Sequence, residues 1–294
     1  MGANNRFIHL PKNTRASHSG FTIIELVVVI VVLGIVSVGM SGVIRQAMDS
    51  VITLTERENL VAQGSFLSER FNRELSLAIP NSARISGDAL TQCIEFVPTL
   101  FSSTYLTLPI SGSSDDTADL IELSDVNGRA FTPTTSDFAI VYPTSAQQVY
   151  TLSEEHRQAV VSCSDDGSDS DCSTLDDSDK VVQLEVSSGF AQTSPSRRIY
   201  FARNAISYCM RNNEVYRHED SINESQTVYT SGGDLMAQDV LNQLTPNPAT
   251  GPQSPFKSVA AAQNRNAAIQ SLFIFGRENE RVTFMQEVLI TNAP

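Results

Sequence analysis

The sequence has little positive charge. It contains 20 lysine and arginine residues against 33 aspartate and glutamate residues, which gives a net charge of −13 at pH 7. Nucleic-acid binding needs a basic surface that neutralises phosphates. We therefore expect no nucleic-acid partner.

The sequence also lacks the short motifs of common enzyme classes. It has no GxSxG, HExxH, Walker or GxGxxG pattern. Two of its four histidines, His9 and His18, lie in the first 20 residues. The other two, His156 and His218, are predicted to be surface residues rather than catalytic bases. We predict that the chain is not an enzyme, although a membrane-anchored periplasmic enzyme stays open as an alternative.

Two stretches near the N-terminus each lack a kind of charge. Residues 1–20 contain three basic residues and no acid, and the 19 residues from Leu26 to Ile44 contain no charge at all. A helix of that length spans about 28 Å, close to the roughly 30 Å of a bilayer core. A buried core helix is the alternative, but the β-branched run Val27–Val32 and the one-sided positive charge favour the membrane. The positive-inside rule then leaves residues 1–20 in the cytoplasm.

One acid lies at the edge of this apolar run. Gly20, Phe21, Thr22, Glu25 and Leu26 follow the basic leader, and an aliphatic helix continues to Val36. This order resembles the class III signal of type IV prepilins and type II secretion pseudopilins. The resemblance implies cleavage between Gly20 and Phe21 by a membrane aspartyl prepilin peptidase, followed by N-methylation of Phe21.

Glu25 has a physical role in this scheme. Cleavage creates a cationic amine at Phe21, and a carboxylate one helical turn away or on a neighbouring subunit can pair with it. Glu25 is therefore predicted to set the register of assembly. The alternative is an acid that is tolerated because it reaches the membrane interface.

The apolar pattern becomes amphipathic after the predicted span. The helix is expected to run from Phe21 to about Ile79, where Pro80 ends it. We divide the chain into a cleaved leader at 1–20, a membrane or filament-core helix at 21–44, an amphipathic continuation at 45–80 and a β-rich head at 81–294. The head carries an acidic loop at 163–180.

The head shows strand and turn signals. β-branched and aromatic runs alternate with turn residues, and Asn212-Asn213 connects two runs as a hairpin would. We predict an α+β fold of the type IV pilin-like class, with the long N-terminal helix packed on a C-terminal antiparallel β-sheet. The predicted strands are 91–99, 119–124, 137–143, 181–187, 197–203, 205–211, 214–219, 272–276 and 282–290.

All four cysteines lie beyond the predicted span, where an exported chain forms disulfides. Four cysteines allow three pairings. Cys163 and Cys172 flank only eight residues and are predicted to pair, which leaves Cys93 to pair with Cys209. Zinc is the alternative, but the spacing fits no CxxC knuckle.

Between Cys163 and Cys172 the chain is rich in aspartate. Calcium favours carboxylate oxygens on a flexible loop, so Asp165, Asp166, Asp169 and Asp171 are candidate ligands. The segment lacks the order of an EF-hand loop, and a solvated acidic insertion is the plainer interpretation. No other cofactor is expected.

Several segments together resemble the O-type minor pilins of mannose-sensitive haemagglutinin (MSHA) pilus systems in Gram-negative bacteria. They are residues 65–86, the segments around Cys93 and Cys209, and the ending VTFMQEVLITNAP, whereas the acidic insertion departs from that family. The resemblance implies a low-abundance subunit that acts in pilus initiation near the tip, first anchored in the inner membrane with a periplasmic head and then part of the surface pilus. It also implies prepilin peptidase, other major and minor pilins and the inner-membrane assembly platform as partners. The J-type minor pseudopilin of type II secretion is the nearest alternative.

Overall fold

The computed structural model describes residues 20–121, 123, 131–165, 172, 180–259, 268–278 and 280–289. It confirms the α+β fold class, with a long N-terminal helix followed by antiparallel sheets. The chain divides into two compact units, residues 1–54 and 55–294, and we describe each by itself.

Helix α1 (Ile23–Ser76) is the main element of the N-terminal unit and continues into the next. It passes through Gly34, Gly39 and Gly42 without a break, and no residue of the N-terminal unit packs within 4 Å of the position of a side chain at these glycines. Within the described residues, α1 is the one helix long and apolar enough to cross a membrane.

The end of α1 differs from the prediction. The helix stops at Ser76, three residues before Ile79, with Leu77 and Ala78 N–H groups bonded to carbonyls three residues back. The Ile79 N–H instead donates to the Val97 carbonyl at 2.8 Å. Pairing with residues 97 and 98 therefore ends the helix before Pro80 is reached.

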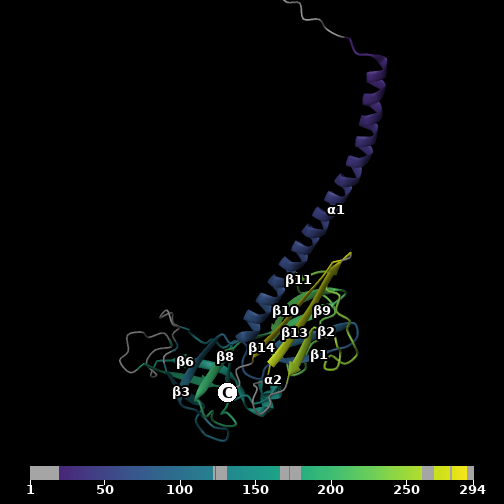
Figure 1. The fold of residues 1–294 in the computed structure, drawn as a ribbon. Coiled ribbons are helices and arrows are strands. Elements are labelled where there is room, and N and C mark those ends of the chain that lie inside the picture. Colours follow the sequence, from purple (N-terminus) through teal and green to yellow (C-terminus); the bar gives the residue numbers. More distant parts are fainter. Residues whose placement is uncertain are drawn as a thin grey trace, which may run out of the picture. The chain divides into compact units, whose positions relative to one another are not determined.

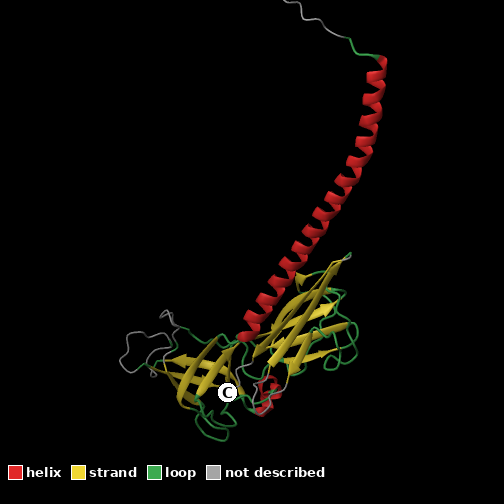
Figure 2. Cartoon of the chain, viewed as in Figure 1, coloured by secondary structure: helices red, strands yellow, loops and turns green. Residues whose placement is uncertain are grey.

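The C-terminal unit contains two antiparallel sheets (Figures 1 and 2). The five-stranded sheet has the order β1-β2-β9-β10-β11, and the three-stranded sheet has the order β12-β13-β14. Their bounds are β1 (Arg84–Gly87), β2 (Thr91–Phe96), β9 (Asn204–Arg211), β10 (Glu214–Ser221), β11 (Asp234–Ala237), β12 (Phe256–Val259), β13 (Ala268–Arg277) and β14 (Glu280–Leu289).

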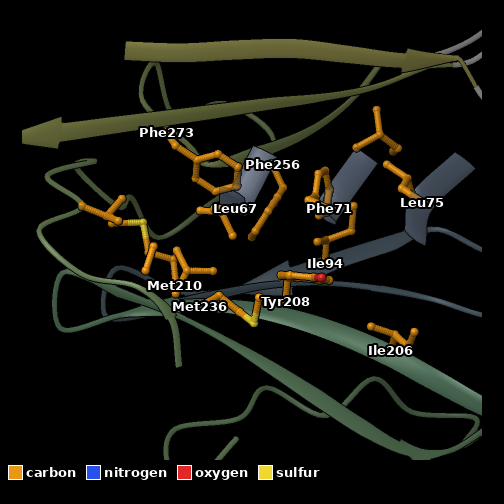
Figure 3. Packing of buried hydrophobic residues seen from close by; sticks show 14 of the residues in the cluster. Leu67, Phe71, Leu75, Ile94, Ile206, Tyr208, Met210, Met236, Phe256 and Phe273 are labelled. Atoms are coloured by element: carbon orange, nitrogen blue, oxygen red, sulfur yellow. The ribbon is translucent and has the colours of Figure 1, made fainter. Parts of the chain in front are cut away.

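The C-terminal part of α1 lies between these two sheets rather than on a single sheet as predicted. Leu67, Phe71 and Leu75 are buried and point into one core that both sheets line (Figure 3). The Phe71 ring lies 5.2 Å from Tyr208 of β9 and 6.2 Å from Phe273 of β13, centroid to centroid. These residues form one apolar stripe that fills the core, whereas Glu69 and Arg73 on the other side of the helix are exposed.

Between two strands of the five-stranded sheet, the chain forms a closed barrel. Its order is β3-β4-β7-β6-β5-β8, and it lies in the chain between β2 and β9. The predicted fold has these strands in one sheet with the others, so the barrel is an addition to it. Its elements are β3 (Phe101–Thr107), β4 (Thr117–Ile121), β5 (Phe138–Val141), α2 (Ala146–Tyr150), a 3-10 turn (Leu152–Glu154), β6 (Arg157–Ser164), β7 (Val181–Val186) and β8 (Arg198–Ala202).

An irregular segment, residues 222–233, connects β10 to β11, and we call it the strap. Three arginines from three strands donate hydrogen bonds to its carbonyls: Arg157 to Ile222, Arg84 to Asn223 and Glu224, and Arg211 to Tyr229 and Gly232. Burial lowers the pKa of Arg157 to about 10. These bonds satisfy buried charges and fix the strap over the sheet.

Candidate functional site: the processing and assembly segment

The predicted cleavage bond lies just outside the start of α1. Gly20, Phe21 and Thr22 have no regular secondary structure, and the helix begins at Ile23. The Phe21 side chain is 81% exposed. A peptidase needs an accessible chain outside regular secondary structure, and the described residues on both sides of the Gly20–Phe21 bond are exposed and non-helical.

Thr22 fixes where the helix begins. Its Oγ1 accepts a hydrogen bond from the Glu25 N–H at 3.3 Å, and its carbonyl accepts one from the Leu26 N–H at 3.2 Å. This is the N-cap bond of a capping box. The capping role of Thr22 was not predicted, although the Thr-x-x-Glu spacing of residues 22–25 is a signal for it.

Glu25 lies in the first turn of α1 and is exposed. The N-terminal end of a helix favours a negative charge, so the carboxylate is compatible with this turn. No ion pair to Glu25 occurs in the part of the chain that the structure describes. Its charge is thus available to a group outside this helix or to a new amine at Phe21.

No residue of the most apolar part of α1 is buried. Each large aliphatic side chain left in water costs about 1.5–3 kcal/mol relative to its burial, so this segment requires an apolar environment. The exposed apolar surface of α1 continues past Arg45, the first charged residue after Glu25. Its members recur at helical spacing along one side: Ile44, Ala47, Met48, Val51 and Ile52.

A model of a known family matches this segment. The family described as the prokaryotic N-terminal methylation motif matches residues 15–41, which include Gly20, Phe21 and Glu25. The comparisons with curated proteins and with solved structures found no match.

This motif supports a type IV prepilin-like protein, and it implies processing by a prepilin peptidase and assembly with other pilins. With the long apolar helix and the antiparallel sheets, the chain has a type IV pilin-like α+β architecture. Such a motif indicates a structural pilin-like subunit that is anchored in a membrane.

The structure joins Cys93 to Cys209 and Cys163 to Cys172, the pairs expected from the sequence. Cys93 and Cys209 face each other on β2 and β9, the strands that enter and leave the barrel. Because their neighbours Ile94 and Tyr208 point into the α1 core, both cysteines point to the opposite side of the sheet. The disulfide therefore closes the base of the barrel insertion.

The candidate calcium ligands fall mostly outside the described residues. Asp166, Asp169 and Asp171 are not described, whereas Asp165 is described and is 8% exposed. Within the described ranges no group of three or more His, Cys, Asp or Glu side chains is arranged to hold a metal ion.

Both histidines outside the leader are buried, so the prediction of surface positions is wrong. His156 is 3% exposed, and its Nδ1 lies 2.9 Å from the Val141 carbonyl. His218 is 8% exposed, stacks on Tyr229 of the strap at 4.1 Å and lies 3.4 Å from Arg211. The strap covers the strand on which the sequence placed an exposed His218.

Proposed function

We propose that this chain is a minor pilin that enters a type IV pilus of the MSHA type and acts in pilus initiation near the tip. One observation carries the proposal: a prepilin-type cleavage motif precedes a helix whose most apolar part is unburied and whose first turn holds a single carboxylate. In this proposal the protein is first anchored in the inner membrane with its head in the periplasm, and is then incorporated into the surface pilus.

Glu25 is proposed to pair with the N-terminal amine of Phe21, either within one chain or between neighbouring subunits. The two residues are four positions apart in sequence, with Phe21 two positions before the first residue of α1 and Glu25 in the first turn of that helix. In an apolar helix bundle an unpaired charge is costly, so this pairing would select the correct register of insertion.

The size of the head supports a minor rather than a repeating subunit. Removing 20 of 294 residues leaves 274, and the head includes the two sheets and the inserted barrel. A shaft subunit must pack its head against many copies of itself, and so large a head is hard to repeat at close spacing.

The same motif and helix also fit the J-type minor pseudopilin of type II secretion. A deletion strain complemented with wild type, Glu25→Ala or Glu25→Asp separates the two assignments. We expect surface pili to be lost in the deletion and with Glu25→Ala, partly restored with Glu25→Asp, and secretion to be unchanged. Lost secretion with normal pili would assign the chain to the secretion system, and no effect on either would overturn both assignments.

A further inference from the structure

Strand β14 has a long free edge. It pairs with β13 over all ten residues, from Glu280 to Leu289, without a register shift. It is the last strand in the order β12-β13-β14, and among the described residues no strand pairs with its other side. Figure 1 shows β13 and β14 as the long strands near the C-terminus.

The other sheet edges in the described ranges are short or absent. Strands β1, β11 and β12 have four residues each, the pairing of β11 with β10 contains a register shift, and the barrel is closed. Natural proteins shorten, bend or close edges to prevent unwanted pairing. The edge of β14 has none of these protections: it is long, regular and contains no proline.

The hydrogen bonds of β13 identify which backbone groups of β14 are free. The Ile274 carbonyl accepts from the Leu241 N–H at 2.6 Å, and the Gly276 N–H donates to the Asp239 carbonyl at 2.9 Å, on the side of β13 away from β14. Their partners on β14 are Thr283 and Arg281. In an antiparallel pair, two opposite residues either both point their N–H and C=O groups at each other or both point them away. Thr283 and Arg281 therefore point theirs away from β13, to the free edge. The same holds for every odd-numbered residue of β14: Arg281, Thr283, Met285, Glu287 and Leu289.

The side chains along this edge are also incompletely covered. Met285 is 63% exposed and Leu289 is 60% exposed. On the other face, Val282, Phe284 and Val288 pack on the α1 core but are only partly buried. One more strand beside β14 would cover part of both faces as well as pair the free backbone groups.

We propose that β14 receives an extended strand from a different pilin-like subunit, by β-strand addition. The inference rests on the proposed function. Neighbours in a filament are related by a screw operation, so β14 cannot meet β14 of the next copy in that arrangement and must meet another edge. The other edge strands in the described ranges have four residues each, which is too short to pair along the ten residues of β14. A non-identical subunit can supply a strand of matching length with apolar side chains opposite Met285 and Leu289.

The test uses the full-length chain in its own membrane, with a photo-crosslinking amino acid at Thr283. Met285→Pro removes one outward N–H that β13 does not use, so proline is compatible with the internal ladder. Met285→Ala is the matched control, because it removes the same side chain and keeps the N–H. The Cys93–Cys209 disulfide and protease resistance report whether each variant folds.

We expect a crosslinked adduct with another protein that carries a prepilin-type motif. Met285→Pro should lower the adduct yield at least tenfold relative to Met285→Ala, since the two variants lack the same side chain and differ in the outward N–H. Hydrogen exchange of the unmodified chain is a second readout: the amides of Thr283, Met285 and Glu287 should gain at least tenfold protection upon assembly. Because this measurement uses the unmodified chain, it tests the inference even if the proline variant fails to fold.

An adduct with a second copy of this chain, or unchanged protection of these amides in assembled filaments, would overturn the inference. Cleavage at Gly20 and the Glu25 phenotype are scored in the same strain. If both are present without strand addition, the proposed function stands and the inference about β14 fails alone. If cleavage is absent, the proposed function fails as well.

Discussion

The ring of Phe284, on strand β14, lies directly over the backbone of Gly64, on helix α1. A side-chain carbon at Gly64 would overlap the ring edge, so the three-stranded sheet approaches the helix this closely because residue 64 is glycine. Phe284 also packs at 5.8 Å, edge to face, on Phe275 of β13. This contact links the helix to the sheet that covers it.

Gly64→Ala should therefore destabilise the C-terminal unit. Alanine favours a helix over glycine by about 1 kcal/mol, but overpacking at a fixed contact costs about 1–3 kcal/mol, and we expect a net loss of about 1 kcal/mol in the free energy of unfolding. In a Phe284→Ala background the same change should become stabilising. A double-mutant cycle by denaturant unfolding measures both, and equal effects in the two backgrounds would refute the contact.

Glu74 of α1 is the main polar link between the helix and the five-stranded sheet. It accepts bonds from Arg217 at 3.0 Å and from the Tyr208 hydroxyl at 2.9 Å. Burial raises the pKa of Tyr208, and Glu74 raises it further. Glu74→Ala would leave the largely buried Arg217 with only the more exposed Glu219 as its ion-pair partner, and we predict a loss of about 1–3 kcal/mol. Glu69→Ala, at an exposed position on the same helix, is the control and should cost less than about 0.5 kcal/mol.

The two disulfides should contribute unequally to stability. Cys93 and Cys209 are 116 residues apart in sequence and enclose the barrel, whereas Cys163 and Cys172 are 9 apart. In the chain-entropy model the larger loop contributes about 5 kcal/mol and the smaller about 3 kcal/mol. We predict that Cys93→Ala/Cys209→Ala lowers the melting temperature more than Cys163→Ala/Cys172→Ala. Calorimetry of both double variants would disprove this if the order were reversed.

His218 should make stability depend on pH. Burial lowers the pKa of its imidazole, Arg211 lowers it further, and Asp234 opposes the shift in part. Because the unfolded histidine titrates near pH 6.5, the unfolded chain binds the proton more readily. The contribution is complete above about pH 6.5 and is lost as the pH falls toward the folded-state pKa. The free energy of unfolding, measured between pH 7.5 and 5, should decrease as the pH falls in the wild type and should decrease less in His218→Gln. An identical pH dependence in the two proteins would exclude His218 as the cause.

Short sequence patterns correctly predicted a tight turn, several strands and the long helix, because each of these depends mainly on neighbouring residues. Asn212 and Asn213 predicted a hairpin, and both adopt positive φ angles of 49° and 64°, as a tight two-residue turn requires. The strand runs around Cys93 and Cys209 were found because their β-branched and aromatic content is high. The helix period in α1 was equally clear.

Long-range partners were not predictable in the same way. The runs that form β5 and β8 have the same pattern as those that form β2 and β9, yet the first pair closes into a barrel and the second lies in an open sheet. Alternation reports that a strand has a buried side, not which strand lies beside it. The burial of His218 was missed because the strap that covers it has no periodic pattern.

The intact mass of the protein from cells with and without their prepilin peptidase shows whether the Gly20–Phe21 bond is cut. We predict a mass equal to residues 21–294 plus one methyl group when the peptidase is present, and the uncut 294-residue mass when it is absent. An uncut chain recovered from assembled filaments, in cells with an active peptidase, would contradict the assignment of Gly20 and Phe21 as the processing site.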